Sequence, residues 1–553
     1  MKDGFQISLP HLPNDIVNSA RKTKLCAYAV ALEGWRRGLR LKWYTKDHDF
    51  FENDNMVVFG VNPPGRLFSL SSENRTHYFF RTRGDKVTNE AVRIGSDKEL
   101  TKVWLKEADV PVPSGKGFEA EASDDEILQY GNEIGYPLVL KPTNGSLGNG
   151  VITNIKNDSH LKNAIDYVRN ELGYKDVIVE KFVLGEEYRI YVIDAEAVAA
   201  YNRVPANIVG DGIQTVEQLI EDKNQQRKKN PRLFSCLINI DKEIIESLGN
   251  DGYTLESVPE KGKLIYLREK TNISSGGDPI DVTDTLANEI KEIAVKAIKA
   301  IPGLYHGGVD IIVNHQQPMG QNAVVIELNP TAQIGGILYP IKGKARDIPA
   351  AIIDYYFPET RGMNTHDSRV YFDFNIALEP LQNRSAVEIE IPQAPLGTFY
   401  AKKYTVSGQV NRYNFHRWLK NKAIASNLNG YIKKTINGEI EVVVGGTNKN
   451  VVSTFKDVIT SNKKLAKVTN VKEEILKEHI KIGFEISEEF NVNKLKSVES
   501  ALKRLERDLK DINKEIDQLE KENKKMKRST SWKFAMPFRK FGKIKRKVKV
   551  KVF

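Results

Sequence analysis

The sequence predicts a multidomain protein that combines α/β and α+β domains. Short apolar runs typical of β-strands alternate with helix-compatible stretches up to about residue 360, and β-branched alternation follows Pro358. With 553 residues the chain has room for roughly three to four domains of ordinary size, and a hydrophobic content of 40% is enough to build packed cores. We therefore expect a globular, multidomain chain.

Residues 1–95 predict a small N-terminal α/β domain. A helix-compatible stretch at 19–38 precedes short strand-like runs such as THYFFRT at 76–82. The domain either shapes a substrate pocket or caps the fold, and the sequence leaves both open. Its basic residues Arg75, Arg81 and Arg83 are interpreted as a solvated face, with substrate binding as the alternative.

The segment VLKPTNGSLGNGV at 139–151 predicts a phosphate-binding loop. An apolar strand-like run leads through Lys141 into a loop that contains Gly145, Gly148 and Gly150. Glycines allow successive backbone N–H groups to converge on anionic oxygens, and the lysine adds a point charge. A simple hairpin turn is the alternative interpretation.

Two later strand-like runs predict a metal site. HGGVDIIV at 306–313 carries Asp310, and VVIELNPTAQIGG at 324–336 carries Glu327 and Asn329. Residues two apart on a strand share a face, so three oxygen ligands converge if the runs pair. Mg²⁺ prefers such oxygen donors together with substrate phosphates. The alternative is ordinary polar residues at strand ends.

Between the loop and these strands, VIVEKFVLGEEYRIYV at 177–192 predicts a nucleotide hinge. Backbone groups from Glu180 to Val183, including Lys181, are placed to pair with an adenine edge. Glu187 is placed to accept hydrogen bonds from ribose hydroxyl groups.

These segments occur in the order and spacing of the ATP-grasp ligases, which the chain resembles from about residue 85 to residue 360. The first of them is SDKELTKVWLKEADVPVP at 96–113, and IELNPTAQIGG is the last. Residues 199–221 and 267–283 resemble the segments that cyanophycin synthetase and the fused bacterial glutathione synthetase place over their amino-acid substrate. We assign the ATP-grasp domain to 96–362.

The resemblance implies a role for each site residue. Lys102 and Lys141 would contact the ATP phosphates, and Glu180 and Glu187 would bind the nucleoside. The metal residues would hold two Mg²⁺ ions, with Mn²⁺ as an alternative. The positions implied for the substrate carboxylate or the acyl phosphate are Arg203, Arg268, Asn272, Ser274 and Ser275, although a simple turn is an equal alternative for the two serines.

The reaction implied is ATP-dependent ligation of a carboxylate to an amine. The carboxylate of an amino acid or short peptide would attack the γ-phosphate to give an acyl phosphate, and an amine would then displace phosphate. The alternatives are acylphosphatase-type hydrolysis by a later domain and a non-enzymatic ATP-binding scaffold or regulator.

That later domain is predicted at 396–480, after a connecting β segment at 363–395. Strand, helix, strand, strand, helix and strand follow one another between 404 and 474, the split βαβ order. The segment resembles acylphosphatase, but the catalytic arginine of that family falls on His416 and its catalytic asparagine on Lys434. We therefore favour docking or ligand sensing over catalysis.

Residues 490–527 predict a coiled coil that forms a homodimer, with a helix packed on its own protein as the alternative. The polar Asn523 at an a position favours a dimer. The heptad a positions are Leu495, Leu502, Leu509, Ile516 and Asn523.

The tail at 528–553 carries the net charge of the chain. Eleven Lys or Arg and no acidic residues lie at 527–553, so 72 basic and 72 acidic residues balance elsewhere and the charge of +11 belongs to this end. Aromatic residues interleave with these cations, a mixture suited to an anionic membrane surface, and nucleic acid is the less favoured partner.

Location follows from what the sequence lacks. No apolar run approaches the ~18 residues needed to span a bilayer, the N-terminus has no signal-peptide pattern, and Cys26 and Cys236 have no metal-ligand spacing. We expect a cytoplasmic protein, peripheral at the inner face of the cell membrane. The segment at 529–541 resembles one that ends many bacterial cell-envelope enzymes, which suggests modification of an envelope polymer.

Overall fold

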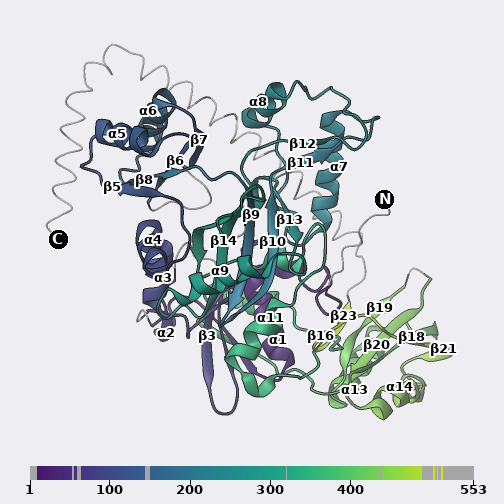
Figure 1. Cartoon of the computed structure of the whole chain (residues 1–553). Coiled ribbons are helices and arrows are strands. Elements are labelled where there is room, and N and C mark those ends of the chain that lie inside the picture. The colour runs from purple at the N-terminus through teal and green to yellow at the C-terminus, as the bar shows by residue number, and fades with distance from the viewer. Residues whose placement is uncertain are drawn as a thin grey trace.

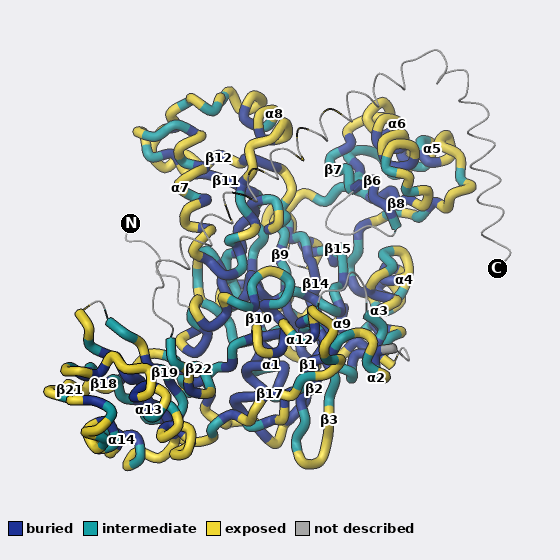
Figure 2. The backbone as a smooth tube through the Cα atoms, turned by 180° about the vertical axis from the view of Figure 1, so that it is seen from behind, coloured by how far each residue is buried: buried dark blue, intermediate teal, exposed yellow. Residues whose placement is uncertain are grey.

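The structure is a computed structural model that describes residues 9–487 apart from 53–54, 59–63, 144–149, 319, 366 and 436, together with six isolated residues between 502 and 518. Figure 1 shows a central body with two lobes above it and a further lobe at its lower right. Buried backbone runs through the central body, and exposed residues gather on the outer surfaces of the lobes (Figure 2).

The base of the body combines the N-terminal segment with residues that come much later in the chain. Helix α1 (Leu25–Arg36) is buried along its whole length and packs against α11 (Ile348–Tyr356). β17 (Glu388–Ile391) pairs with β1 (Arg40–Tyr44), so part of the segment treated above as a connector, 363–395, belongs to the N-terminal sheet. The sheet has the order β17-β1-β2-β3-β4, with β2 at Leu67–Ser71, β3 at Thr76–Phe80 and β4 at Arg83–Gly84.

Short helices connect these elements to the rest of the molecule. They are η1 (Asn18–Ala20), η2 (Lys22–Lys24), α2 (Asp49–Glu52), α3 (Asn89–Ser96), α4 (Lys98–Glu107), α10 (Gly335–Leu338), η5 (Pro358–Thr360) and α12 (Asn375–Gln382).

The upper left lobe in Figure 1 is a four-stranded antiparallel sheet with helices against it. Its first helix begins with a capping box, in which Ser123 and Glu126 satisfy each other's backbone N–H groups. Along the sheet order β5-β8-β6-β7, the strands are β5 (Gly115–Phe118), β8 (Val177–Lys181), β6 (Leu138–Pro142) and β7 (Ile152–Ile155), and the helices are α5 (Asp124–Ile134), α6 (Asp158–Asp166) and η3 (Tyr167–Glu171).

A five-stranded sheet forms the centre of the molecule. α9 (Asn288–Lys299) and α3 pack against it and enclose an aliphatic core with Ile190, Val309 and Val325. The order is β13-β10-β9-β14-β15, with β13 at Asp278–Asp281, β10 at Glu196–Val204, β9 at Glu186–Ile193, β14 at His306–Val313 and β15 at Ala323–Asn329.

The second upper lobe is inserted between β10 and β13. Its own small core includes Ile208, Ile220 and Ile265. The elements are β11 (Asn207–Val209), α7 (Val216–Lys229), α8 (Lys242–Asn250), β12 (Leu264–Tyr266) and η4 (Ile273–Ser275).

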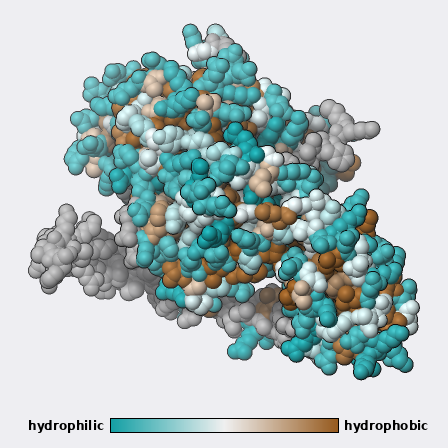
Figure 3. Space-filling model, turned by 90° about the horizontal axis from the view of Figure 1, so that it is seen from below, coloured by the Kyte–Doolittle hydropathy of each residue, from teal (hydrophilic) through white to brown (hydrophobic). Residues whose placement is uncertain are grey.

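The lower right lobe confirms the predicted split βαβ domain. Its elements are β18 (Tyr400–Gln409), α13 (Tyr413–Ala425), β19 (Asn429–Lys434), β20 (Ile440–Gly446), α14 (Lys449–Ser461) and β21 (Lys467–Ile475), in the sheet order β21-β18-β20-β19-β23. Strand β23 (Phe484–Ser487) extends the sheet beyond the predicted end at 480, and β22 (Ile480–Lys481) pairs with β16 (Val370–Tyr371) of the body. Seen from below, hydrophobic side chains gather over this lobe and along part of the body (Figure 3).

The predicted coiled coil at 490–527 and the basic tail at 528–553 lie outside the described residues, apart from six helical residues between 502 and 518. Among the helices that the structure does describe, none combines the length and the apolar character that crossing a membrane requires.

Candidate functional site

A cavity of about 800 Å³ lies between the sheet of the first lobe and the central sheet. Its volume is in the range of cofactor pockets. The inserted lobe closes a third side through Tyr266 and its neighbours. Residues on its wall include Lys98, Lys141, Val151, Glu180, Val183, Leu184, Glu187, Asn202, Arg203, Ser247, Asp251, Arg268, Lys270, Asn272, Ile312, Ile326 and Glu327.

At the first wall, two lysines meet the carboxylate of Glu180: Lys141, which lines the cavity, and Lys102 of α4, which does not. Lys141 Nζ lies 2.7 Å from one oxygen of Glu180, and Lys102 pairs with the other oxygen. Burial by itself would raise the pKa of Glu180, but the two ammonium groups outweigh it and the pKa is lowered. Burial lowers the pKa of Lys102, and Glu180 opposes this effect. The group keeps one net positive charge, which suits a phosphate.

The glycine loop beside this wall is described only at its end. Gly145 and Gly148 fall at 144–149, outside the described residues. Gly150 has φ +73°, and a Cβ atom there would lie 2.8 Å from Pro142 Cγ. Both the left-handed backbone and the lack of space require glycine at this position.

The opposite wall brings together charges from three adjacent strands. Arg189 holds Asp310 with two hydrogen bonds of 2.6 Å each. Arg203 Nη1 bridges Asp310 at 3.0 Å and Glu187 at 2.5 Å, and Thr271 donates to the other oxygen of Glu187. Burial raises the pKa of Glu187 against the opposing effect of Arg203, whereas for Asp310 the arginines outweigh burial and lower the pKa. Neighbouring carboxylates whose pKa values are shifted in opposite directions are typical of functional sites.

A β-bulge in β15 decides which of its side chains reach the cavity. The register with β14 shifts at Ile326. Strict alternation would place Glu327 and Asn329 on the face of Val325, which packs in the core. The extra residue instead lets Ile326 and Glu327 both line the cavity, and Leu328 returns to the core.

The three predicted metal ligands are adjacent in the sheet. Asp310 lies directly opposite Glu327, and Asn329 Nδ2 donates to Asp310 Oδ2 at 3.4 Å. Two carboxylates and an amide oxygen form a donor set of the hard type that Mg²⁺ selects. Among the described residues, no group of three or more His, Cys, Asp or Glu side chains is placed to hold a metal ion. The predicted set contains only two such side chains, Asp310 and Glu327, together with the amide of Asn329. Its role as a metal site therefore stays a prediction.

The predicted nucleoside segment lines the cavity, but the side chain of Lys181 is engaged elsewhere. Its ammonium group donates to the carbonyl oxygens of Gly135 at 3.0 Å and Tyr136 at 2.9 Å, at the end of α5. Val183 and Leu184 lie on the cavity wall. For Lys181, only the backbone is available to a nucleotide in this arrangement.

The predicted substrate residues divide into two groups. Arg268 and Asn272 line the cavity, and Arg268 lies 2.6 Å from Asp241 and also pairs with Glu243. Ser274 and Ser275 belong to the 3-10 turn η4, where the hydroxyl group of Ser275 donates to the carbonyl oxygen of Asn272 at 3.3 Å. The turn interpretation therefore fits the two serines.

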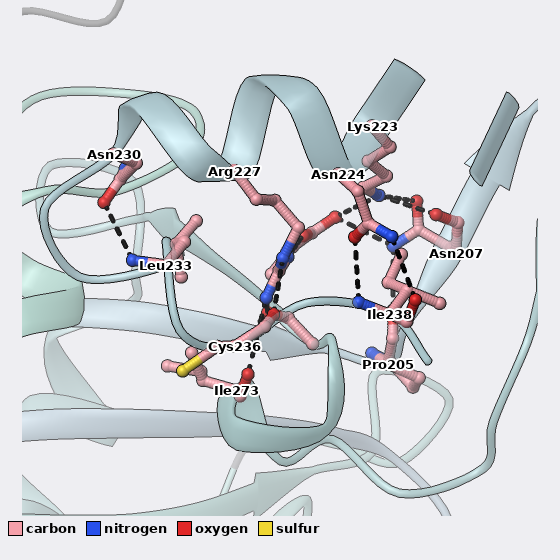
Figure 4. Close-up of polar contacts among 12 residues, drawn as sticks. Pro205, Asn207, Lys223, Asn224, Arg227, Asn230, Leu233, Cys236, Ile238 and Ile273 are labelled. Atoms are coloured by element: carbon pink, nitrogen blue, oxygen red, sulfur yellow. Dashed lines mark hydrogen bonds and ion pairs between the residues drawn. The ribbon is translucent and has the colours of Figure 1, made fainter. Parts of the chain in front are cut away.

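A polar cluster on α7 holds the predicted substrate segment in place (Figure 4). Arg227 is fully buried and donates to Asp278 Oδ1 at 2.7 Å, to the carbonyl oxygen of Cys236 at 2.8 Å and to that of Gly277 at 3.1 Å. Lys223 completes the cluster by binding Asp278 at 2.6 Å. This one helix thus fixes the loops on both sides of Arg268.

We expect Arg227→Met to loosen this lobe. The change leaves Asp278 buried with Lys223 as its remaining cation, a loss of about 3 kcal/mol that corresponds to roughly a hundredfold faster amide exchange along α7. Lys228→Met is the control, because Lys228 is exposed and forms a long ion pair of 3.6 Å with the exposed Glu221. Hydrogen exchange followed by mass spectrometry measures both variants, and equal exchange in the two would contradict the clamp.

Sequence reasoning missed two residues that line the cavity, Lys98 and Thr271, and Arg189, which lies beside it and holds Asp310. Arg189 stands two residues after Glu187 on β9, so period-two alternation is a signal that would have placed both on one face. Thr271 and Lys98 carry no such signal. Burial lowers the pKa of Lys98, and Glu327 lies close enough to oppose that effect.

The geometry agrees with comparisons to known proteins. The sequence matches the ATP-grasp domain family over residues 95–334. We call this matched segment the ATP-grasp domain, after the family that it resembles. Both walls of the cavity and all of the predicted metal ligands belong to this ATP-grasp domain, which confirms the predicted resemblance.

Two curated relatives are similar to part of this chain. Cyanophycin synthetase of Nostoc sp. is 34% identical over 281 residues, which cover 50% of this chain and 31% of that protein. The glutathione biosynthesis bifunctional protein of Streptococcus mutans is 37% identical over 345 residues, covering 59% of this chain and 45% of that protein. The chain therefore spans less than half the length of these relatives. Among solved structures, the bifunctional glutathione synthetase of Pasteurella multocida has 28% identity and a TM-score of 0.43 and covers 57% of this chain and 42% of its own.

The lower right lobe matches the acylphosphatase family over residues 402–486. His416, at the position of the family's arginine, is buried, and its Nε2 lies 2.9 Å from the carbonyl oxygen of Val410. Lys434, at the position of the asparagine, is the last residue of β19. The lobe thus has the acylphosphatase-like fold, and the replacement of the two catalytic residues by His416 and Lys434 stays a prediction.

Proposed function

We propose that the chain is an ATP-dependent carboxylate–amine ligase that acts on an amino acid or short peptide through an acyl phosphate. The main support is one cavity in the ATP-grasp domain that brings Lys141 and Glu180 from one lobe to face Glu327 and Arg203 from the other. The experiment that tests it is capture of the acyl phosphate by hydroxylamine in the presence of Mg-ATP.

The residues in and beside the cavity have separate roles in the proposed reaction. Lys102 and Lys141 neutralise the phosphate oxygens of ATP, while the backbone at 180–183 and the carboxylate of Glu187 orient the nucleoside. An oxygen of the donor carboxylate forms a bond to the γ-phosphorus, and the bond to ADP breaks. The amine then attacks the acyl carbon, loses a proton and expels phosphate. Arg203 and Arg268 stabilise the charge that develops on the transferred group.

Divalent metal ions would be held by Asp310, Glu327 and Asn329. We propose two Mg²⁺, with Mn²⁺ as the alternative, and such ions neutralise phosphate charge when bound. Arg189 keeps Asp310 ionised through its double hydrogen bond. This arginine also fixes the direction of the carboxylate before any ligand arrives.

For the acylphosphatase-like domain we propose docking or ligand sensing rather than catalysis. The inner face of its sheet packs against the body, where Ala401 and Val443 share one core with α1, and Arg369 ties the lobe to the body through the carbonyl oxygen of Phe399 at 2.7 Å. Figure 1 places this lobe at the base, away from the space between the two upper lobes. An acyl phosphate made in the cavity would have to leave it to reach this domain.

We expect the full-length chain to hydrolyse benzoyl phosphate no faster than a protein-free control. A lysine cannot accept the hydrogen bond that an amide oxygen takes from water, and the buried His416 does not replace an arginine fork. Release of inorganic phosphate measures the rate. A protein-dependent rate that survives Lys141→Met, and so does not come from the ATP-grasp cavity, would overturn this role.

The C-terminal segments of the chain, at 490–553, suggest where in the cell the proposed ligase acts. We propose that the coiled coil at 490–527 forms a homodimer and that the basic tail at 528–553 binds an anionic membrane surface from the cytoplasmic side. The charge of +11 that gathers at this end supports the second proposal. An envelope polymer is the corresponding candidate for a modified product.

A further inference from the structure

The acylphosphatase-like lobe carries an excess of positive charge that the proposed ligase chemistry does not use. Residues 400–487 contain 16 Lys or Arg and seven Asp or Glu, a net charge of +9. Residues 1–399 contain 46 Lys or Arg and 55 Asp or Glu, a net charge of −9. The balanced charge of the chain before its tail therefore conceals a separation of charge between the body and this lobe.

Much of the excess lies on the two helices of the lobe. Helices α13 and α14 pack on one face of the sheet, where Phe415 and Phe455 belong to a common core. The opposite face meets the body through Val443, so the helices form the layer that faces away from the body. With the residues that flank them they are here called the helix layer, which carries eight Lys or Arg and one acidic residue at 412–426 and 448–464.

Helix α13 presents its cations without acidic partners. The helix contains no Asp or Glu. Within the described residues no ion pair is formed by its N-cap or by its own cations, which are Arg412, Arg417, Lys420 and Lys422. By contrast, ion pairs engage four lysines on the strands of the lobe, Lys402, Lys403, Lys472 and Lys481. The unpaired charge of the lobe is thus concentrated on its outer helices.

Exposed apolar side chains share one face of α13 with these cations. Tyr413 is 62% exposed and Ile424 is 50% exposed. Arg417 and Lys420 lie between them at spacings of four, three and four residues, which place all four side chains on one face of the helix. Arg417 Cζ lies 5.8 Å from the centroid of the Tyr413 ring. A helix face that mixes cations with exposed aromatic and aliphatic side chains suits the headgroup region of an anionic bilayer.

The other basic group that the sequence indicates does not form such a surface. Arg75, Arg81 and Arg83 were expected to form a solvated face, but Arg83 is 1% exposed and spends its donors on backbone carbonyl oxygens. Arg81, which has a left-handed φ of +59°, is half-buried. Of the three, only Arg75 is exposed, and it pairs with Glu359 at 3.5 Å. The expectation of a solvated face is therefore wrong for this hairpin.

An anionic bilayer fits this charge separation better than nucleic acid does. A bilayer is an extended negative surface, so it attracts the lobe and repels the body, and the helix layer turns toward it. Figure 1 places α13 and α14 at the base of the molecule, so the two upper lobes and the cavity between them would stay clear of the surface. The exposed Ile424 adds nothing to binding by phosphate contacts, which dominate the affinity for nucleic acid. Figure 3 shows hydrophobic side chains among hydrophilic ones over this lobe.

We propose that the helix layer of the acylphosphatase-like lobe, with α13 in front, binds the anionic surface of a lipid bilayer. This names the partner for the docking role proposed above and rests on that role, and it does not depend on the ligase chemistry. The basic tail at 528–553 would provide a second contact with the same surface. Two such contacts are what stable peripheral binding requires.

Vesicle binding by the full-length protein tests this proposal. The protein is sedimented with vesicles of phosphatidylcholine, with and without phosphatidylserine, and we expect binding only to the anionic vesicles. Arg417→Gln combined with Lys420→Gln should weaken this binding about tenfold, because each cation near an anionic surface adds to it. The control combines Lys156→Gln with Lys162→Gln, two exposed cations of the first upper lobe, and should bind like the unchanged protein. All variants keep the tail, so a difference between them reports on the lobe.

Ile424→Ser separates a lipid surface from other anions. The change keeps every charge, so it should weaken binding to the anionic vesicles about threefold and leave binding to a DNA oligonucleotide unchanged. The side chain is half exposed, so the midpoint of thermal unfolding should stay the same. Unchanged vesicle binding by Ile424→Ser would contradict a lipid partner.

Two other results would also overturn this inference. One is equal binding to anionic vesicles by the Arg417/Lys420 variant and its control, which would leave the tail as the sole membrane contact. The other is tighter binding of the full-length protein to the oligonucleotide than to the vesicles, lost in the same variant, which would make nucleic acid the partner. Hydrolysis of benzoyl phosphate by the protein would instead overturn the docking role itself.

Discussion

Glu327→Ala should reduce donor-dependent ADP formation on the order of a thousandfold, about 4 kcal/mol in transition-state stabilisation. The bulge in β15 turns this carboxylate into the cavity, directly opposite Asp310, where the proposed phosphoryl transfer would develop charge. A coupled assay for ADP with the best donor measures the loss.

The matched control for this variant is Glu292→Ala. Glu292 is an exposed carboxylate on α9, the helix that covers the other face of the same sheet. It should keep turnover near that of the unchanged protein. Turnover by Glu327→Ala within threefold of the control would remove Glu327 from the metal site.

Lys141→Met should lower kcat/KM for ATP by about a hundredfold or more, roughly 3 kcal/mol, because a buried point charge no longer meets the phosphates. Lys141 is the last charged side chain before the glycine loop and lies 2.7 Å from Glu180. Its loss leaves Lys102 as the remaining cation on that carboxylate. Methionine keeps the length of the side chain, so packing changes little.

Lys162→Met serves as the control for the second variant, since Lys162 is exposed on α6 of the same lobe. Steady-state kinetics with varied ATP should show no change in it. A fall of the same size in both lysine variants would indicate a general effect on the lobe and would contradict a phosphate contact at Lys141.

Much of this site could be predicted from short motifs. Lys141, Asp310 and Glu327 each stand in an apolar strand-like run, where a charged residue is unusual, and all three reach the same region. The succession of strands and helices along the acylphosphatase-like domain could also be predicted, because the alternation of each strand is local.

What escaped prediction depends on contacts across the chain. The bulge at Ile326, the capture of Lys181 by carbonyl oxygens at the end of α5, and the pairing of β17 with β1 leave no trace in local periodicity. The left-handed Arg81 sits in a stretch that reads as an ordinary basic strand. Such strained or unpaired residues are where local rules fail, and they gather at functional sites.

The most direct test of the ligase account is hydroxylamine capture by the full-length protein. Protein, Mg-ATP and hydroxylamine are incubated with a panel of amino acids and dipeptides, and hydroxamate and ADP are measured together. The account predicts hydroxamate in equal amount to ADP for at least one donor, and neither product above background with Glu327→Ala. ADP release without hydroxamate for every donor on the panel, or no ADP at all, would contradict it.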